Sequence, residues 1–119
     1  MIRILTTIAL SALLAGTPAL AQPAQPLSLE HRTALRCSAA FAIVATLQQQ
    51  GGAKEYPAMA ERGREYFVRA NARVMEETGM DRAAVSAQLK AEAQDLAGDP
   101  ARLEAVMPAC LLLLNSSGI

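Results

Sequence analysis

The sequence predicts an all-α domain, a small four-helix up-down bundle in which one disulfide joins the first and last helices. Three observations indicate this fold. Four segments carry apolar residues at helical spacing, no stretch shows the sustained alternation of a strand, and the chain has 2 cysteines, one near each end of the helical region. The connections between the four segments are short, which favours neighbouring helices that run in alternating directions.

The first helix is expected over residues 28–50. Ser28 is a suitable N-cap residue, and two glycines follow the end of the segment. Its apolar face holds Cys37 and Phe41, and alanines cover much of the remaining surface. A helix that is apolar on most of its sides packs against several neighbours, so this helix is expected at the centre of the bundle.

The second helix is expected over residues 56–78, with Pro57 in its first turn and Gly79 directly after its end. Gly63 lies near the middle of its apolar stripe. Glycine inside a helix costs about 1 kcal/mol relative to alanine. The close approach of another helix at Gly63 is the expected reason for a residue without a side chain at this position.

The third helix is expected over residues 82–97, with Asp81 as its cap and a narrow apolar stripe that places it at the edge of the bundle. The fourth helix begins with Pro100 and continues to the end of the domain. Pro108 lies inside it and is expected to kink or break it, because proline lacks the backbone N–H and its ring opposes the carbonyl four residues earlier. Such a kink would set the angle at which Cys110, two residues on, meets its partner.

The two cysteines are expected to form a disulfide. Cys37 lies on the inner face of the first predicted helix, and Cys110 lies on that of the fourth. In an exported chain an even number of cysteines most simply pairs. Closing a loop of roughly 74 residues would stabilise the fold by about 4.5 kcal/mol on the chain-entropy model.

Residues 1–21 are typical of a cleavable export signal. Arg3 is the positive residue, residues 4–15 are apolar and uncharged, and the ALA at 19–21 fits the small-x-small cleavage pattern. An apolar run of this length is too short to span a bilayer, which needs about 20 residues, so no stable membrane insertion is expected after cleavage. The expected organisation is the signal, a Pro- and Gln-rich linker at 22–27, the bundle at 28–115 and a polar tail at 116–119.

These features predict a periplasmic or secreted protein. Without the signal the chain keeps 10 of the 11 basic residues against 11 acidic ones, so its formal charge is −1. Nucleic-acid binding is not expected, because it requires a basic excess. No cofactor is expected either, and one histidine with two paired cysteines makes a poor set of metal ligands.

Few residues are candidates for catalysis. His31 lies in the first turn of the first predicted helix, and the sequence places no catalytic partner beside it. Glu61 and Glu65 are one helical turn apart and could hold a metal ion or act as acid and base. A solvated charged face is the simpler interpretation, because nothing apolar surrounds them to shift a pKa. A small enzyme that uses Glu61, Glu65 or His31 is therefore a less favoured hypothesis, and a purely structural envelope component is a further one.

Two features of the second predicted helix indicate binding. Arg62, Arg69 and Arg73 fall along one flank beside Tyr66. Such a stripe could grip a carboxylate or a phosphate group, although paired surface arginines are the simpler interpretation.

The second feature consists of Val68 and Met75, seven residues apart on the side away from the main apolar stripe. They could form a contact with a partner protein or a second copy, although isolated exposed apolar residues are common. The favoured hypothesis is a non-enzymatic binding or interaction module. Its expected partner is another periplasmic protein, a second copy of the chain or a small ligand.

Three segments, CSAAFAIV at 37–44, RGREYF at 62–67 and MPAC at 107–110, together resemble a group of small, uncharacterised exported helical proteins of alphaproteobacteria. This resemblance implies no activity, cofactor or site residue. A looser likeness connects the chain to small periplasmic acid-stress chaperones, which are also helical with one disulfide. That likeness is architectural only, and it supplies the alternative hypothesis of an acid- or envelope-stress chaperone-like protein.

Overall fold

The computed structural model describes residue 16 and residues 27–119. This part of the chain forms four helices and no strand: α1 (Leu29–Gln49), α2 (Arg62–Thr78), α3 (Arg82–Ala97) and α4 (Pro100–Ser116). Except for residue 16, the expected signal segment lies outside the described residues. The expected linker lies outside them as well, except for its last residue, Leu27. The predicted all-α class is confirmed for the described part of the chain.

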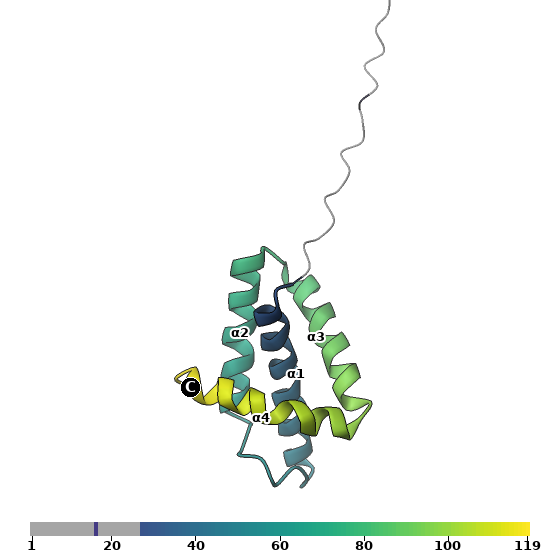
Figure 1. Cartoon of the computed structure of the whole chain (residues 1–119), viewed down its shortest axis with the longest axis vertical. Coiled ribbons are helices and arrows are strands. Elements are labelled where there is room, and N and C mark those ends of the chain that lie inside the picture. The colour runs from purple at the N-terminus through teal and green to yellow at the C-terminus, as the bar shows by residue number, and fades with distance from the viewer. Residues whose placement is uncertain (1–15, 17–26) are drawn as a thin grey trace, which may run out of the picture.

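Helices α1, α2 and α3 lie side by side and run in alternating directions, with α1 between the other two (Figure 1). Helix α1 packs against each of the other three helices, as expected for its apolar surface. Helix α4 lies across the first three helices instead of running alongside them (Figure 1). The four-helix bundle is therefore confirmed, with the last helix crossing its face.

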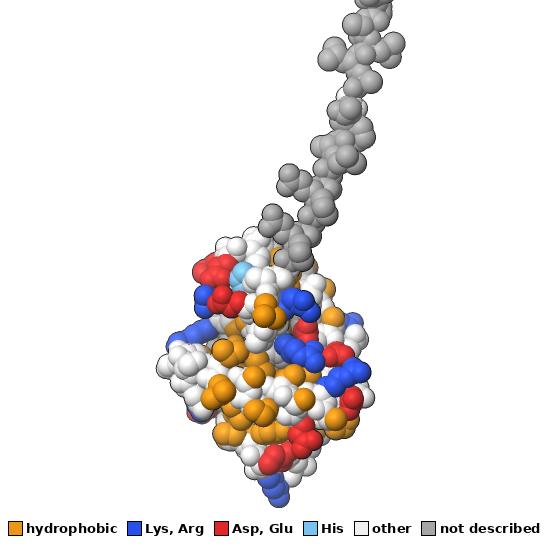
Figure 2. Space-filling view, in the orientation of Figure 1, with side chains coloured by type: hydrophobic (Ala, Val, Ile, Leu, Met, Phe, Trp, Pro, Cys, Tyr) orange, Lys and Arg blue, Asp and Glu red, His pale blue; other side chains and the backbone are white. Residues whose placement is uncertain are grey.

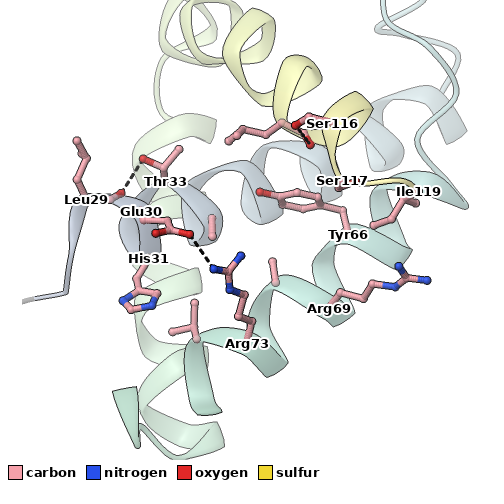
Figure 3. A pocket seen from close by; sticks show the side chains of 14 residues that line it. Leu29, Glu30, His31, Thr33, Tyr66, Arg69, Arg73, Ser116, Ser117 and Ile119 are labelled. Carbon is pink, nitrogen blue, oxygen red and sulfur yellow. Dashed lines mark hydrogen bonds and ion pairs between the residues drawn. The ribbon is translucent and has the colours of Figure 1, made fainter. Parts of the chain in front are cut away.

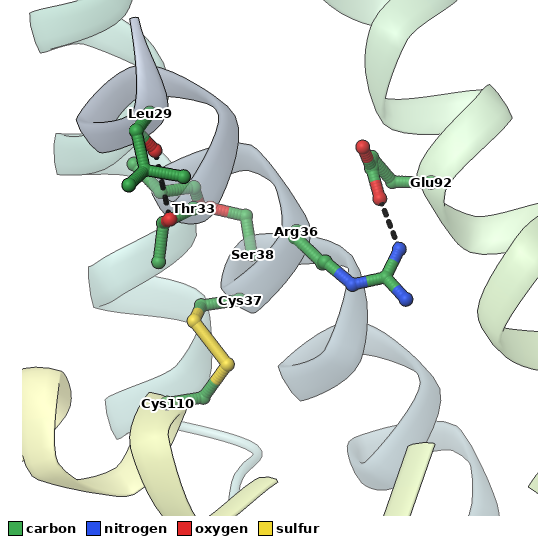
Figure 4. The surroundings of a disulfide bond; sticks show 8 residues. Leu29, Thr33, Arg36, Cys37, Ser38, Glu92 and Cys110 are labelled. Carbon is green, nitrogen blue, oxygen red and sulfur yellow. Dashed lines mark hydrogen bonds and ion pairs between the residues drawn. A yellow bond between two sulfur atoms is a disulfide. The ribbon is translucent and has the colours of Figure 1, made fainter. Parts of the chain in front are cut away.

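The disulfide between Cys37 and Cys110 joins α1 to α4 (Figure 4). Their Cα atoms are 5.2 Å apart, a usual spacing for a disulfide. Both residues are buried in the main hydrophobic cluster. The predicted covalent link between the first and last helices is therefore confirmed, and it fixes the crossing helix to the centre of the bundle.

The core consists of two hydrophobic clusters. The main cluster surrounds Phe41 of α1, whose ring lies edge-on to Tyr66 of α2 with centroids 5.1 Å apart. The second cluster joins Leu35, Val74 and Val85, one residue from each of the first three helices. The helices of the bundle are thus held by one large cluster around the disulfide and one smaller cluster between α1, α2 and α3.

Gly63 allows α2 to approach α1 closely. A Cβ atom at this position would lie 3.1 Å from the Cβ of Phe41 and 3.3 Å from the Cβ of Met59. Both neighbours are fully buried, and a Cβ atom cannot move away by a simple rotation of its side chain. The expected close approach at Gly63 is confirmed, and Phe41 is the α1 residue that requires it.

The predicted start of the second helix is wrong, because α2 begins at Arg62 and not at residue 56. The preceding loop is held by Gln48 of α1. The Gln48 side-chain amide donates to the carbonyl of Pro57 at 2.9 Å, and its oxygen accepts the N–H of Met59, also at 2.9 Å. These backbone groups are therefore bound to a side chain of another helix, and the buried side chain of Met59 anchors the loop in the core.

Of the predicted kink or break at Pro108, the break is wrong, because α4 is continuous from Pro100 to Ser116. Pro108 and Glu104, whose carbonyl lacks its usual helical donor, both lie on the exposed side of α4. Water can bind a carbonyl on this side, which reduces the cost of the missing hydrogen bond. The disulfide at Cys110 holds the following turn against α1.

Candidate functional site

A groove of about 750 Å³ lies between the first half of α1, the middle of α2 and the end of α4 (Figure 3). This volume is within the range of about 300 to 1,000 Å³ that is common for ligand sites. Its apolar lining consists of Leu29, Ala34, Tyr66, Ala70, Val74, Leu113 and Ile119. In the space-filling view hydrophobic side chains gather along α4 and beside it, with charged side chains around them (Figure 2).

Arg62 holds the end of the chain and does not line the groove. Its guanidinium donates to the backbone oxygen of Ile119 at 2.9 and 3.1 Å and to the side-chain oxygen of Asn115 at 3.0 Å. The expected polar tail is thereby attached to the start of α2, and Ile119 contributes to the groove. The structure thus separates Arg62 from the other two arginines of the predicted stripe.

Arg69 and Arg73 line the groove together with Tyr66, as the spacing along the helix indicated. Arg69 pairs with Glu65 at 2.6 Å on the same helix. Arg73 reaches Glu30 on α1 at 3.0 Å and Glu77 at 2.6 Å. The hydrogen bond to Glu77 raises the pKa of Arg73 above its ordinary value. Both guanidinium groups therefore lie at the edge of an apolar groove and are held there by carboxylates.

The ring of Tyr66 lies across the middle of the groove and its hydroxyl points toward α1 (Figure 3). Burial raises the pKa of this hydroxyl above its ordinary value, so it stays protonated and can donate a hydrogen bond. The hydroxyl makes no hydrogen bond with any residue in the described part of the chain. It is therefore a donor that faces the groove.

Ser28, His31 and Glu77 form a hydrogen-bonded chain beside the groove. Nε2 of His31 lies 2.6 Å from a carboxylate oxygen of Glu77, and Nδ1 lies 2.9 Å from the hydroxyl oxygen of Ser28. The same hydroxyl oxygen accepts the backbone N–H of His31 at 3.1 Å and so caps α1. Glu77 could not be predicted as a partner of His31, because the two residues lie 46 positions apart in the sequence.

The order of hydroxyl, imidazole and carboxylate in this chain is also found in serine hydrolases. In those enzymes the serine bonds Nε2 and the carboxylate bonds Nδ1, whereas the two nitrogens are exchanged here. Ser28 is already engaged as a helix cap. We therefore assign the chain the structural role of joining the start of α1 to the end of α2.

The other two acidic candidates for catalysis lie at the opposite end of α2. Glu61 directly precedes α2, and Glu65 in its first turn pairs with Arg69. At about 1.5 Å per residue, Glu61 is about 24 Å along the helix axis from Glu77, the partner of His31. The structure therefore does not bring Glu61, Glu65 and His31 together.

Val68 and Met75 have different surroundings. Val68 is 59% exposed on the outside of α2, but Met75 is partly buried against the second cluster. On α4, the large apolar side chain with the highest exposed fraction is Leu112, at 71%. Val68 and Met75 thus do not form one continuous exposed face.

Among residue 16 and residues 27–119, no group of three or more metal-ligating side chains lies close enough to hold a metal ion. In the same part of the chain, no helix has both the length and the apolar character that crossing a membrane requires. Comparisons of the chain with family models, curated proteins and solved structures found no match.

Proposed function

We propose that the protein is an exported, non-enzymatic binding module and that its ligand site is the groove between α1, α2 and α4. The observation that carries this proposal is an apolar groove of ligand-site volume that has two arginines and a tyrosine hydroxyl on its walls. A mostly apolar lining with a few polar groups is the usual composition of a small-molecule site. The same groove can also accept a segment of a partner protein.

Export is supported by the sequence of the first 21 residues and by the disulfide, because disulfides persist in oxidising compartments. The expected product of cleavage begins at Gln22. N-terminal sequencing and mass measurement of the protein from a periplasmic fraction test this expectation. A chain that keeps residues 1–21 and stays in the cytoplasm would contradict export.

Ligand binding in the groove is tested with 1-N-phenylnaphthylamine, a neutral apolar dye whose emission rises in apolar surroundings. Ala70→Trp places a large side chain in the groove, whereas Ala72→Trp places the same side chain on the exposed face of α2. We expect Ala70→Trp to weaken dye binding at least tenfold and Ala72→Trp to leave it unchanged. Circular dichroism of both variants establishes that they fold. Equal dye binding by the wild type and folded Ala70→Trp would exclude the groove as the site.

An acid-stress chaperone is the second candidate, and the ion pairs between helices favour it. Arg36 of α1 donates to Glu92 at 2.6 Å and to Asp95 at 2.9 Å, both on α3 (Figure 4 shows the Glu92 bond). Protonation of such carboxylates would loosen the helices and expose the core. This hypothesis requires that near-UV circular dichroism is lost between about pH 4 and 2, together with protection of a client protein from aggregation in that range. Unchanged near-UV signal throughout the range would exclude it.

A further inference from the structure

The floor of the groove can bury an apolar chain but offers few hydrogen-bond donors. The hydroxyls of Thr33, Ser116 and Ser117 donate to backbone carbonyls of their own helix, at 2.7, 3.1 and 2.6 Å. Their protons are thus used within the protein. Tyr66 and the two arginines are the side-chain donors that remain for a ligand in the described lining, apart from the imidazole of His31 that Glu77 holds. The polar group of a ligand must therefore be a hydrogen-bond acceptor.

The side-chain charges of the lining favour a negative acceptor. Arg69 and Arg73 contribute two positive charges, and Glu30 is the one carboxylate side chain among the described lining residues. Arg69 and Arg73 are four residues apart on α2, about one helical turn, and their side chains are 61% and 62% exposed. Ion pairs this exposed contribute little to stability. A ligand can therefore replace Glu65 as the partner of Arg69, or Glu30 as one of the two partners of Arg73, at little cost.

We propose that the groove binds a free single-chain carboxylate, with the chain on the apolar floor and the carboxylate at Arg69, Arg73 and the Tyr66 hydroxyl. This inference rests on the proposed function, because it requires that the groove is a ligand site. A carboxylate matches the donors well, since guanidinium groups bind it through paired hydrogen bonds.

Isothermal titration calorimetry of the purified protein with decanoate, decylamine and decanol tests the head group. The three compounds have alkyl chains of the same length, and their head groups differ in charge. We expect decanoate to bind at least tenfold more tightly than either of the other two. Shortening the chain from decanoate to octanoate and hexanoate should weaken binding about fourfold for each methylene removed, until the chain no longer fills the groove.

The arginines are tested by Arg69→Gln and by the double variant with Arg73→Gln. Each should weaken decanoate binding, by at least threefold for the single and tenfold for the double variant, and leave decanol binding unchanged. Arg64→Gln is the matched control, because Arg64 is exposed on the same helix but does not line the groove. If the double variant is poorly folded by circular dichroism, the single variant decides, because the ion pair of Arg69 among the described residues is with Glu65 of its own helix.

The outcomes separate this inference from the proposed function. If no decyl compound and no apolar dye binds, the groove is not a ligand site and both proposals fail. If decanol and decylamine bind as tightly as decanoate and the arginine variants have no effect, the groove is a ligand site but the charge assignment is wrong. Sedimentation with vesicles of phosphatidylglycerol and phosphatidylethanolamine tests a membrane surface as the source of the anion. Binding to vesicles without binding to monomeric decanoate would overturn the inference.

Discussion

The imidazole of His31 lies 2.6 Å from the carboxylate of Glu77 and connects the first turn of α1 to the last turn of α2. The His31 side chain is 17% exposed, so this bond is partly shielded from water. Glu77 also accepts a hydrogen bond from Arg73, which itself pairs with Glu30 of α1. The contact between α1 and α2 at the edge of the groove is thus made by one linked set of polar groups.

A double-mutant cycle should detect coupling between His31 and Glu77. We expect His31→Ala and Glu77→Ala each to lower the free energy of unfolding, and their effects to be non-additive because the two side chains are hydrogen-bonded to each other. Urea unfolding followed by circular dichroism measures the coupling energy. Ser28→Ala is measured alongside, because loss of the cap should cost about 1 kcal/mol by itself. A coupling energy near zero would mean that the contact does not hold the helices together.

Stability should fall as the pH falls below the ordinary carboxylate range. Hydrogen bonds from Arg73 and His31 hold the pKa of Glu77 below its ordinary value of 4.5. Hydrogen bonds from Arg36 and Arg102 do the same for Asp95, below 3.8. A carboxyl group whose pKa is lower in the folded state adds stability above its unfolded pKa. This contribution is lost as the pH falls through the folded value, because the unfolded chain then binds more protons.

The pH dependence is measured as the urea midpoint between about pH 6 and pH 3. The combined variant with Glu77→Gln and Asp95→Asn should be less stable at the upper end and should lose less stability on acidification than the wild type. Glu76→Gln is the control, because Glu76 is exposed on the same helix and forms no ion pair with a described residue. If the combined variant and the wild type lose stability in parallel, these two carboxylates do not carry the effect.

Reduction of the disulfide should destabilise the fold strongly. The bond closes a loop across a sequence separation of 73 residues, and the chain-entropy model gives a cost of about 4.5 kcal/mol for its loss. Urea unfolding with and without reductant measures this cost, and the double variant Cys37→Ala with Cys110→Ala should not respond to reductant. Alkylation and mass spectrometry should find two free thiols only after reduction. Two free thiols in the untreated protein would contradict the bond.

Gly63→Ala should destabilise the protein although alanine is the better helix former. The added methyl group would lie close to the fully buried Phe41 and Met59, and overpacking of a core costs about 1 to 3 kcal/mol. The gain in helix propensity offsets about 1 kcal/mol of that cost. Ala72→Gly, at an exposed position of the same helix, measures the propensity term alone. A Gly63→Ala variant more stable than the wild type would show that α1 can move away.

Pro108→Ala should stabilise the protein by about 1 to 3 kcal/mol, because alanine restores a helical hydrogen bond and removes the proline penalty. We expect the disulfide to form as before, since α4 is already continuous at this position. Urea unfolding and alkylation of the variant measure the two quantities. Loss of the disulfide, or lower stability, would instead support the interpretation that Pro108 sets the angle at which Cys110 meets Cys37.

The starts of three helices follow from chemistry within a few residues of sequence, which is why they could be predicted. The side chains of Ser28, Asp81 and Asp99 each accept a backbone N–H two or three residues later and so cap their helices. The start of α2 could not be predicted in this way, because it depends on Gln48, which lies on another helix. The continuity of α4 at Pro108 also depends on the surroundings of this residue. Pro108 lies on the exposed side of the helix and two residues before the disulfide at Cys110.

Some features of the candidate site could likewise be predicted from the sequence, whereas others depend on the packed structure. Helical periodicity alone places Tyr66, Arg69 and Arg73 on one flank, because residues three and four apart share a face. The groove joins three different helices. The link between His31 and Glu77 spans 46 residues of sequence, and the contact of Arg62 with Ile119 spans 57. Burial of the polar Asn71 is likewise a property of the packed bundle. The sequence therefore determined the helices, their faces and the disulfide through local spacing and cysteine pairing. Only the packed structure decided the crossing of α4 and the groove, because these depend on which distant side chains fill the space between helices.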